Sequence, residues 1–207
     1  MVLGARGKAV LRIALRVAVH VGALVPLGVL VAAYALDRLS VEPIREVTLR
    51  TGRTALVLLL LSLACTPLRL LGVAQAGPLR RPLGLYAAFY ALLHFGVYAL
   101  WDYRLQLDLI WLDLRYNRFL QIGLAALLIV IALAITSTRG WRRRLDRAWA
   151  WLHRLAYAAA ALAVVHYFWA VKADRRVPLV YGGVLALLLL FRLPWVQRAL
   201  ARVRTSR

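Results

Sequence analysis

Four histidines lie in or beside long apolar stretches of this 207-residue chain, at His20, His94, His153 and His166. A polar ring in the hydrocarbon of a membrane costs free energy, so an intramembrane histidine is by default a candidate for a functional site. Neutral imidazole is also a good ligand for iron. Two imidazoles on different helices can therefore bind one iron from opposite sides if they lie at the same depth.

His94 and His166 meet this condition. An α-helix rises about 1.5 Å per residue, which places His94, seven residues before Trp101, roughly 10 Å below the outer surface of a membrane. His166 lies six residues before Lys172, roughly 9 Å below the same surface. We predict that the pair binds a haem iron as axial ligands. The alternative is that each ring only forms a hydrogen bond to a neighbouring helix.

The other two histidines have less certain roles. His153 precedes His166 by thirteen residues, roughly 20 Å along one helix, but an ideal helix would turn the two rings about 140° apart. His153 could bind an inner haem, or serve a flavin, a quinol or the structure. His20 could complete an inner site or contact a quinol, although we expect an interfacial histidine without a cofactor.

Membrane spans must position these side chains. Hydrophobic residues make up 63% of the chain and long uncharged runs recur, which excludes a soluble domain with a core. We predict an all-α membrane protein in which residues 1–207 form one six-transmembrane-helix bundle. The expected spans are 17–36, 54–71, 83–101, 119–135, 149–171 and 177–193. We expect the first span to be an uncleaved transmembrane helix and not a signal peptide. A short interfacial helix is expected over 41–49.

The net charge of +20 is divided unequally between the two sides of the predicted membrane. The side of the N-terminus, called inner, holds 18 basic residues, including Arg69, Arg80 and Arg192, and one acid, Asp146. The outer side holds ten basic residues and seven acids. This positive-inside pattern predicts cytoplasmic N- and C-termini in a bacterial inner membrane. No groove-reading or base-stacking motif accompanies the charge, which argues against nucleic-acid binding.

Several familiar cofactor motifs are missing from the sequence. There is no G-x-G-x-x-G fingerprint, no P-loop and no C-x-x-C-H, and Cys65 is the only cysteine. Electrons would therefore have to come from a partner or a lipid-soluble carrier and leave to a partner. The outer loops 102–118 and 172–176 are the candidate docking surfaces, because they lie beside the predicted haem. Arg80 and Arg81 on the inner side, or Arg50, Arg53 and Arg118 on the outer side, could meet haem propionates.

The order and spacing of short motifs over nearly the whole chain resemble those of the MsrQ family. The motifs are Glu42-Pro43-Ile44, Thr51-Gly52-Arg53-Thr54-Ala55-Leu56, Thr66-Pro67-Leu68-Arg69, Arg80-Arg81-x-Leu83-Gly84-Leu85, Leu93-His94, Thr136-Ser137-Thr138, Leu152-His153-Arg154-x-x-Tyr157 and His166-Tyr167-x-Trp169-x-Val171-Lys172. One departure is Asn117-Arg118-Phe119, where the family tends to have Arg-Pro-Tyr.

The resemblance implies a ferric-reductase-like transmembrane domain that binds one or two b-type haems, with FMN as a further cofactor. His94, His166 and His153 occupy the positions of the family's haem-associated histidines. Electrons would pass from the quinone pool, or from a cytosolic flavin reductase, to MsrP, a periplasmic molybdopterin subunit that reduces methionine sulfoxide in oxidised proteins. The chain itself would be a non-catalytic electron-transfer subunit.

Two other functions stay open at the level of the sequence. One is a ferric reductase or an oxidase-like membrane core that acts on metal or oxygen. The other is a small transporter or assembly factor whose histidines only pack helices together.

Overall fold

The computed structural model describes residues 4–198, apart from the side chains of Ala5 and Lys8. The inner basic residues Arg202, Arg204 and Arg207 and the C-terminus lie outside the described residues. The described part is almost entirely helical, in the order α1 (Ala5–Ala35), α2 (Pro43–Leu70), η1 (Ala74–Leu79), α3 (Arg80–Gly96), η2 (Val97–Asp102), α4 (Leu107–Tyr116), α5 (Arg118–Ile135), α6 (Arg139–Leu152), α7 (Leu155–Ala170) and α8 (Arg176–Leu190). The segment η1 is a 3₁₀-helix and η2 is a π-helix.

Four helical segments are long and apolar enough to cross a membrane: 9–35, 43–70, 74–102 and 118–135. The pair α6 and α7 makes a fifth if the two helices are taken as one bent span. Helix α8 is apolar but has 15 residues, about 22 Å, which is short for about 30 Å of hydrocarbon. A helical membrane protein with several spans is thus confirmed, while six spans and cytoplasmic termini stay predictions.

Two predicted boundaries were wrong. The segment 41–49 does not form a separate interfacial helix, because α2 begins at Pro43 and continues without a break. The span expected over 149–171 is broken: α6 ends at Leu152, α7 begins at Leu155, and their axes differ by 51°. The five arginines of α6 avoid hydrocarbon, so this helix turns away from the bundle. The offset of about 140° between His153 and His166 assumed a continuous helix and does not apply.

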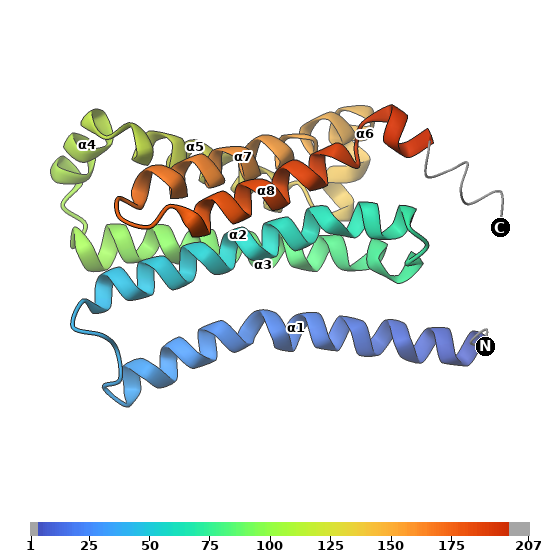
Figure 1. Ribbon diagram of the computed structural model, residues 1–207, viewed down its shortest axis with the longest axis horizontal. Helices are drawn as coiled ribbons and strands as arrows, with labels where there is room; N and C mark the ends of the chain where they lie inside the picture. The colour runs from blue at the N-terminus through green and yellow to red at the C-terminus, as the bar shows by residue number, and fades with distance from the viewer. Residues whose placement is uncertain (1–3, 199–207) are drawn as a thin grey trace.

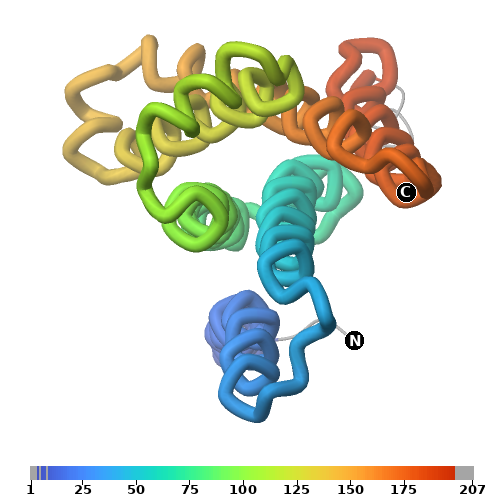
Figure 2. The backbone as a smooth tube through the Cα atoms, turned by 90° about the vertical axis from the view of Figure 1, so that its left-hand side faces the viewer, coloured from blue at the N-terminus to red at the C-terminus, as the bar shows by residue number. Residues whose placement is uncertain are grey.

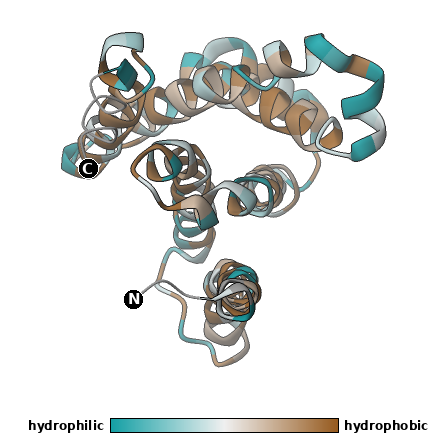
Figure 3. Cartoon of the chain, turned by 90° about the vertical axis from the view of Figure 1, so that its right-hand side faces the viewer, coloured by the Kyte–Doolittle hydropathy of each residue, from teal (hydrophilic) through white to brown (hydrophobic). Residues whose placement is uncertain are grey.

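The chain runs back and forth along one axis (Figure 1). The start of α1, the turn between α2 and α3, helix α6 and the end of α8 lie at one end, which we continue to call inner. Helix α4 and the connections from α1 to α2 and from α7 to α8 lie at the other, outer end. Viewed from the inner end, the most strongly hydrophilic stretch lies on α6, whereas the bundle helices are largely hydrophobic (Figure 3).

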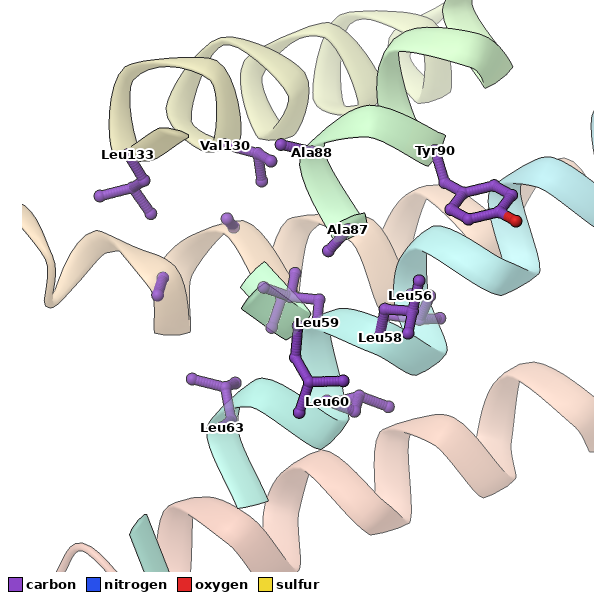
Figure 4. Close-up of a cluster of buried hydrophobic side chains, with 14 of the residues drawn as sticks. Leu56, Leu58, Leu59, Leu60, Leu63, Ala87, Ala88, Tyr90, Val130 and Leu133 are labelled. Carbon is purple, nitrogen blue, oxygen red and sulfur yellow. The ribbon is translucent and has the colours of Figure 1, made fainter. Parts of the chain in front are cut away.

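The helices pack as two close pairs, α2 with α3 and α5 with α7. Helix α8 packs on α7, and α1 stands apart from the bundle on the far side of α2 and α3 (Figure 2). The core between the helices is built from leucines of α2, alanines of α3 and branched side chains of α5 (Figure 4): Leu56, Leu59, Leu60, Leu63, Ala87, Ala88, Val130 and Leu133. Tyr90 of α3 belongs to the same buried cluster but contacts α1. The buried alanines Ala159 and Ala160 let α7 approach its neighbours closely.

Helix α1 is attached to α3 through a tyrosine hydroxyl. Pro26 has no N–H group and weakens the backbone ladder of α1 at that point. The Tyr90 hydroxyl enters the opening, donates to the Ala23 carbonyl at 2.7 Å and accepts from the Leu27 N–H at 3.0 Å. Tyr90 is fully buried, so both backbone groups are satisfied away from water.

Replacing Tyr90 by phenylalanine removes both hydrogen bonds and should destabilise the protein by about 1–3 kcal/mol, because two buried backbone groups lose a partner. Thermal unfolding in detergent micelles measures this loss. Tyr116→Phe is the control, since Tyr116 is exposed. Equal unfolding midpoints for the two variants would show that the hydroxyl does not hold α1.

Candidate functional site

The structure brings together the two histidines that were paired by depth. His94 on α3 and His166 on α7 have ring centres 6.1 Å apart, with the ring planes at 82°. Each ring belongs to a different helix pair, so the gap between the two rings lies at the interface between the pairs.

Both rings are held through Nδ1 by backbone carbonyls. The Nδ1 atom of His94 lies 2.9 Å from the Thr48 carbonyl of α2, and Nδ1 of His166 lies 2.7 Å from the Phe119 carbonyl of α5. A carbonyl oxygen can only accept, so Nδ1 carries the hydrogen in both rings and Nε2 keeps a free lone pair. Metal-binding histidines are usually oriented in this way, with the other ring nitrogen donating to a carbonyl or carboxylate.

A glycine follows each carbonyl by one helical turn. In an α-helix the carbonyl of residue i points towards residue i+4, so a ring that reaches this carbonyl must lie over residue i+4. A Cβ atom at Gly52 would lie 2.9 Å from Nδ1 of His94, and one at Gly123 would lie 2.7 Å from Nδ1 of His166. Only glycine leaves room for the imidazole at these two positions.

The same set of groups thus occurs twice. Helix α2 supplies a carbonyl and a glycine to the histidine of α3, and α5 supplies the same two groups to the histidine of α7. Sequence reasoning found the histidines but missed Gly52 and Gly123. The two positions share no local pattern, since Gly52 lies between Arg50 and Arg53 whereas Gly123 lies in an apolar run, so their role could be interpreted only after the helices had been paired.

A cavity of about 370 Å³ adjoins the two rings, a volume in the range of small-molecule and cofactor sites. Most of its wall is apolar and comes from α2, α3, α5 and α7, including Leu59, Ala87, Leu127 and Ala159. Its polar lining groups gather at the outer end, where the π-helix η2 and α4 contribute: Asp102, Tyr103 and Asp113.

Asp113 ties α4 to the end of α3 at the mouth of this cavity. Its carboxylate accepts from the hydroxyls of Tyr103 at 2.6 Å and Tyr98 at 3.1 Å, and from the amide of Asn117. The hydrogen bond to the carboxylate, with partial burial, raises the pKa of Tyr103 to about 12. Tyr103 therefore keeps its proton, and its bond to α4, throughout the physiological range.

Arg53 also lines the cavity. Its Nε donates to the hydroxyl of Tyr167 at 2.6 Å, and the guanidinium lies 5.7 Å from the centre of the same ring. Since Tyr167 follows His166, Arg53 links α2 to α7 beside the two imidazoles. Arg50, by contrast, forms an ion pair with Glu46.

His153 and His20 do not join this site. His153 lies in the break between α6 and α7, where Nε2 is 3.3 Å from the Thr136 hydroxyl and the ring stacks on Trp149 at 4.0 Å. Nδ1 of His20 lies 2.9 Å from the hydroxyl of Tyr86 on α3. The structure therefore does not bring these two histidines together either.

Gly52→Ala or Gly123→Ala should push the adjacent imidazole out of position, because the new methyl group would lie closer than van der Waals contact. We expect the affinity for haem to fall by about 10- to 100-fold, as for other groups that orient metal-binding histidines. Absorbance titration measures this affinity. Gly28→Ala is the control, since a Cβ there meets nothing within 4 Å. Wild-type affinity in both test variants would refute the crowding argument.

Comparison with known proteins identifies the family to which the chain belongs. Residues 51–164 match the family described as ferric reductase like transmembrane component. The chain is similar to proteins named "protein-methionine-sulfoxide reductase heme-binding subunit MsrQ". That of Xanthomonas axonopodis pv. citri is 44% identical over 94% of this chain and 92% of its own length. The protein of Xanthomonas campestris pv. campestris is 44% identical over 97% of this chain and 94% of its own length. The protein of Deinococcus radiodurans is 46% identical over 84% of this chain and 87% of its own length. No solved structure matches the chain. The chain therefore belongs to the MsrQ family of ferric-reductase-like transmembrane proteins.

Proposed function

We propose that this chain is a membrane electron-transfer subunit that binds b-type haem between His94 and His166. It passes electrons across the bacterial inner membrane to a methionine-sulfoxide reductase in the periplasm. The observation that carries this function is the pair of imidazoles with ring centres 6.1 Å apart, each with Nδ1 bonded to a backbone carbonyl and therefore with a free lone pair on Nε2. The relatives named as heme-binding subunits support the same cofactor.

The residues fit a haem. A metal–imidazole bond of about 2 Å on each side, with roughly 1 Å from nitrogen to ring centre, predicts ring centres about 6 Å apart. The observed separation is 6.1 Å. Two protein nitrogens would complete the coordination of an iron that already has four porphyrin nitrogens. The adjoining wall is apolar, as the porphyrin faces require, and Arg53 is available for a propionate.

A bound haem supplies reversible one-electron chemistry at its iron. The protein sets the conditions for it. The carbonyls of Thr48 and Phe119 fix the tautomers of the two histidines and increase the basicity of Nε2. The apolar wall excludes water and lowers the local polarity, and both effects tune a reduction potential.

The direction of transfer is from the inner to the outer side. Polar residues that line the cavity lie towards the outer end of the helices, so the loops 102–118 and 172–176 are the proposed docking surface for MsrP. The proposed electron donor is the quinone pool or a cytosolic flavin reductase, with FMN as a possible further cofactor. We place both termini in the cytoplasm and treat the chain as one domain with six spans, since the basic residues concentrate on the inner side and α8 follows α7 back towards that side (Figure 1).

His94→Ala and His166→Ala should each abolish the spectrum of a six-coordinate low-spin haem, because one axial ligand is lost. Absorbance spectra of detergent-purified protein, expressed with added haem, test this. His20→Ala is the control, since its ring bonds to Tyr86 outside the cavity. Wild-type protein without a Soret band would instead favour a transporter or assembly factor with structural histidines.

His153→Ala decides the number of haems. If His153 binds a second haem, iron per chain should fall by half while the spectrum of the outer haem survives. Elemental iron and chain concentration, measured on the same sample, give the ratio. An unchanged ratio would assign His153 to its contacts with Thr136 and Trp149.

A further inference from the structure

Three arginines converge at the inner end of the bundle. Arg69 lies in the last turn of α2, Arg80 is the first residue of α3, and Arg192 follows α8. Neighbouring residues of α2 contact two of them: the Ser62 hydroxyl donates to the Arg80 carbonyl at 2.9 Å, and the Leu63 carbonyl accepts from Arg192 at 3.4 Å. Arg80 and Arg192 therefore lie at the same level of α2, and Arg69 lies further towards the inner end of that helix. The fold thus brings three positive side chains from three segments to one end of the bundle.

Arg192 is half-buried rather than extended into water. Its guanidinium lies 5.0 Å from the centre of the Tyr157 ring of α7, and its Nη2 donates to the Leu63 carbonyl of α2 at 3.4 Å. These contacts hold the side chain between α2, α7 and α8. They leave most of its five N–H donors free for another acceptor.

Arg80 is half-buried too, and it lies where η1 runs directly into α3. Its own carbonyl is fixed by the hydroxyl of Ser62 at 2.9 Å, which sets the start of α3 against α2. The first turn of α3 contains no acid, so no carboxylate of that turn neutralises Arg80.

The chain supplies little negative charge at this end. The ion pairs found within residues 4–198 are Arg45 with Glu42 and Arg50 with Glu46, and both lie at the outer end. The one acid on the inner side of the whole sequence is Asp146, on the exposed helix α6. An external anion is therefore the natural partner for the three arginines.

Apolar side chains adjacent in sequence to the arginines favour a lipid over a free ion. After Arg69 come Leu71 and Val73, and around Arg192 lie the exposed side chains Leu189, Leu190 and Leu193. We propose that Arg69, Arg80 and Arg192 bind the phosphodiester of an anionic phospholipid in the inner leaflet, with the acyl chains against these leucines. Guanidinium groups suit this role because they bind phosphate oxygens through paired N–H donors.

Thermal unfolding of the full chain in detergent tests the site. Phosphatidylglycerol should raise the unfolding midpoint of the wild type in a saturable way, and phosphatidylcholine with the same acyl chains should raise it much less. Arg192→Gln and Arg80→Gln should each weaken the apparent affinity for phosphatidylglycerol about tenfold or more, as expected for lost charge-assisted hydrogen bonds. Arg143→Gln on α6 is the matched control: it removes the same charge from an exposed position at the same end.

Each other outcome overturns the site as proposed. An equal loss of affinity for phosphatidylglycerol in Arg143→Gln would mean that the lipid is attracted to the basic surface as a whole. An equal shift from inorganic phosphate would mean a free-anion site, and a shift from FMN without one from phosphatidylglycerol would mean a flavin site. If Arg192→Gln does not elute as a folded monodisperse species in size-exclusion chromatography, the affinity of Arg80→Gln for phosphatidylglycerol alone tests the site. The site lies at the other end of the bundle from His94 and His166, so a failure here leaves the proposed haem between those two histidines untouched.

Discussion

The hydrogen bonds from Nδ1 of His94 and His166 to backbone carbonyls are the interactions on which the rest of the site depends. An imidazole within hydrocarbon must satisfy its N–H, and the carbonyls of Thr48 and Phe119 do so at 2.9 and 2.7 Å. A helical carbonyl already accepts one bond within its own helix, and its second lone pair receives the imidazole. These hydrogen bonds fix the tautomer and the orientation of each ring, and they require a glycine one turn after each carbonyl. They leave the Nε2 lone pair of both rings free.

The sequence was sufficient to predict the pair of histidines because depth in a membrane follows from residue count and helix rise alone. His94 and His166 could be matched without knowing which helices touch. Gly52 and Gly123 could not be found in this way, because their role depends on which helix packs against which histidine. Their importance is a tertiary property: Gly52 lies between Arg50 and Arg53, before the predicted span 54–71, and Gly123 lies within the predicted span 119–135.

The break at His153 was missed for a different reason. The apolar residues Trp149 and Trp151 made the segment look continuous with the following span, and the arginines before it were assigned to a loop. In the structure those arginines belong to α6, whose backbone is kinked at Asp146 and whose axis differs from that of α7 by 51°. Hydropathy also predicted a span over 177–193, but the apolar helix α8 in this region has only 15 residues. The helical membrane architecture was predictable, but the angles at which helices meet were not.

The duplicated arrangement has a consequence for how the molecule is assembled. Each helix pair carries half of the site: one histidine, one carbonyl and one glycine. The pair of α2 and α3 leaves the ribosome before the pair of α5 and α7, whose two helices are separated in sequence by α6. A haem held by both histidines would then stabilise the contact between two parts of the chain that are synthesised one after the other.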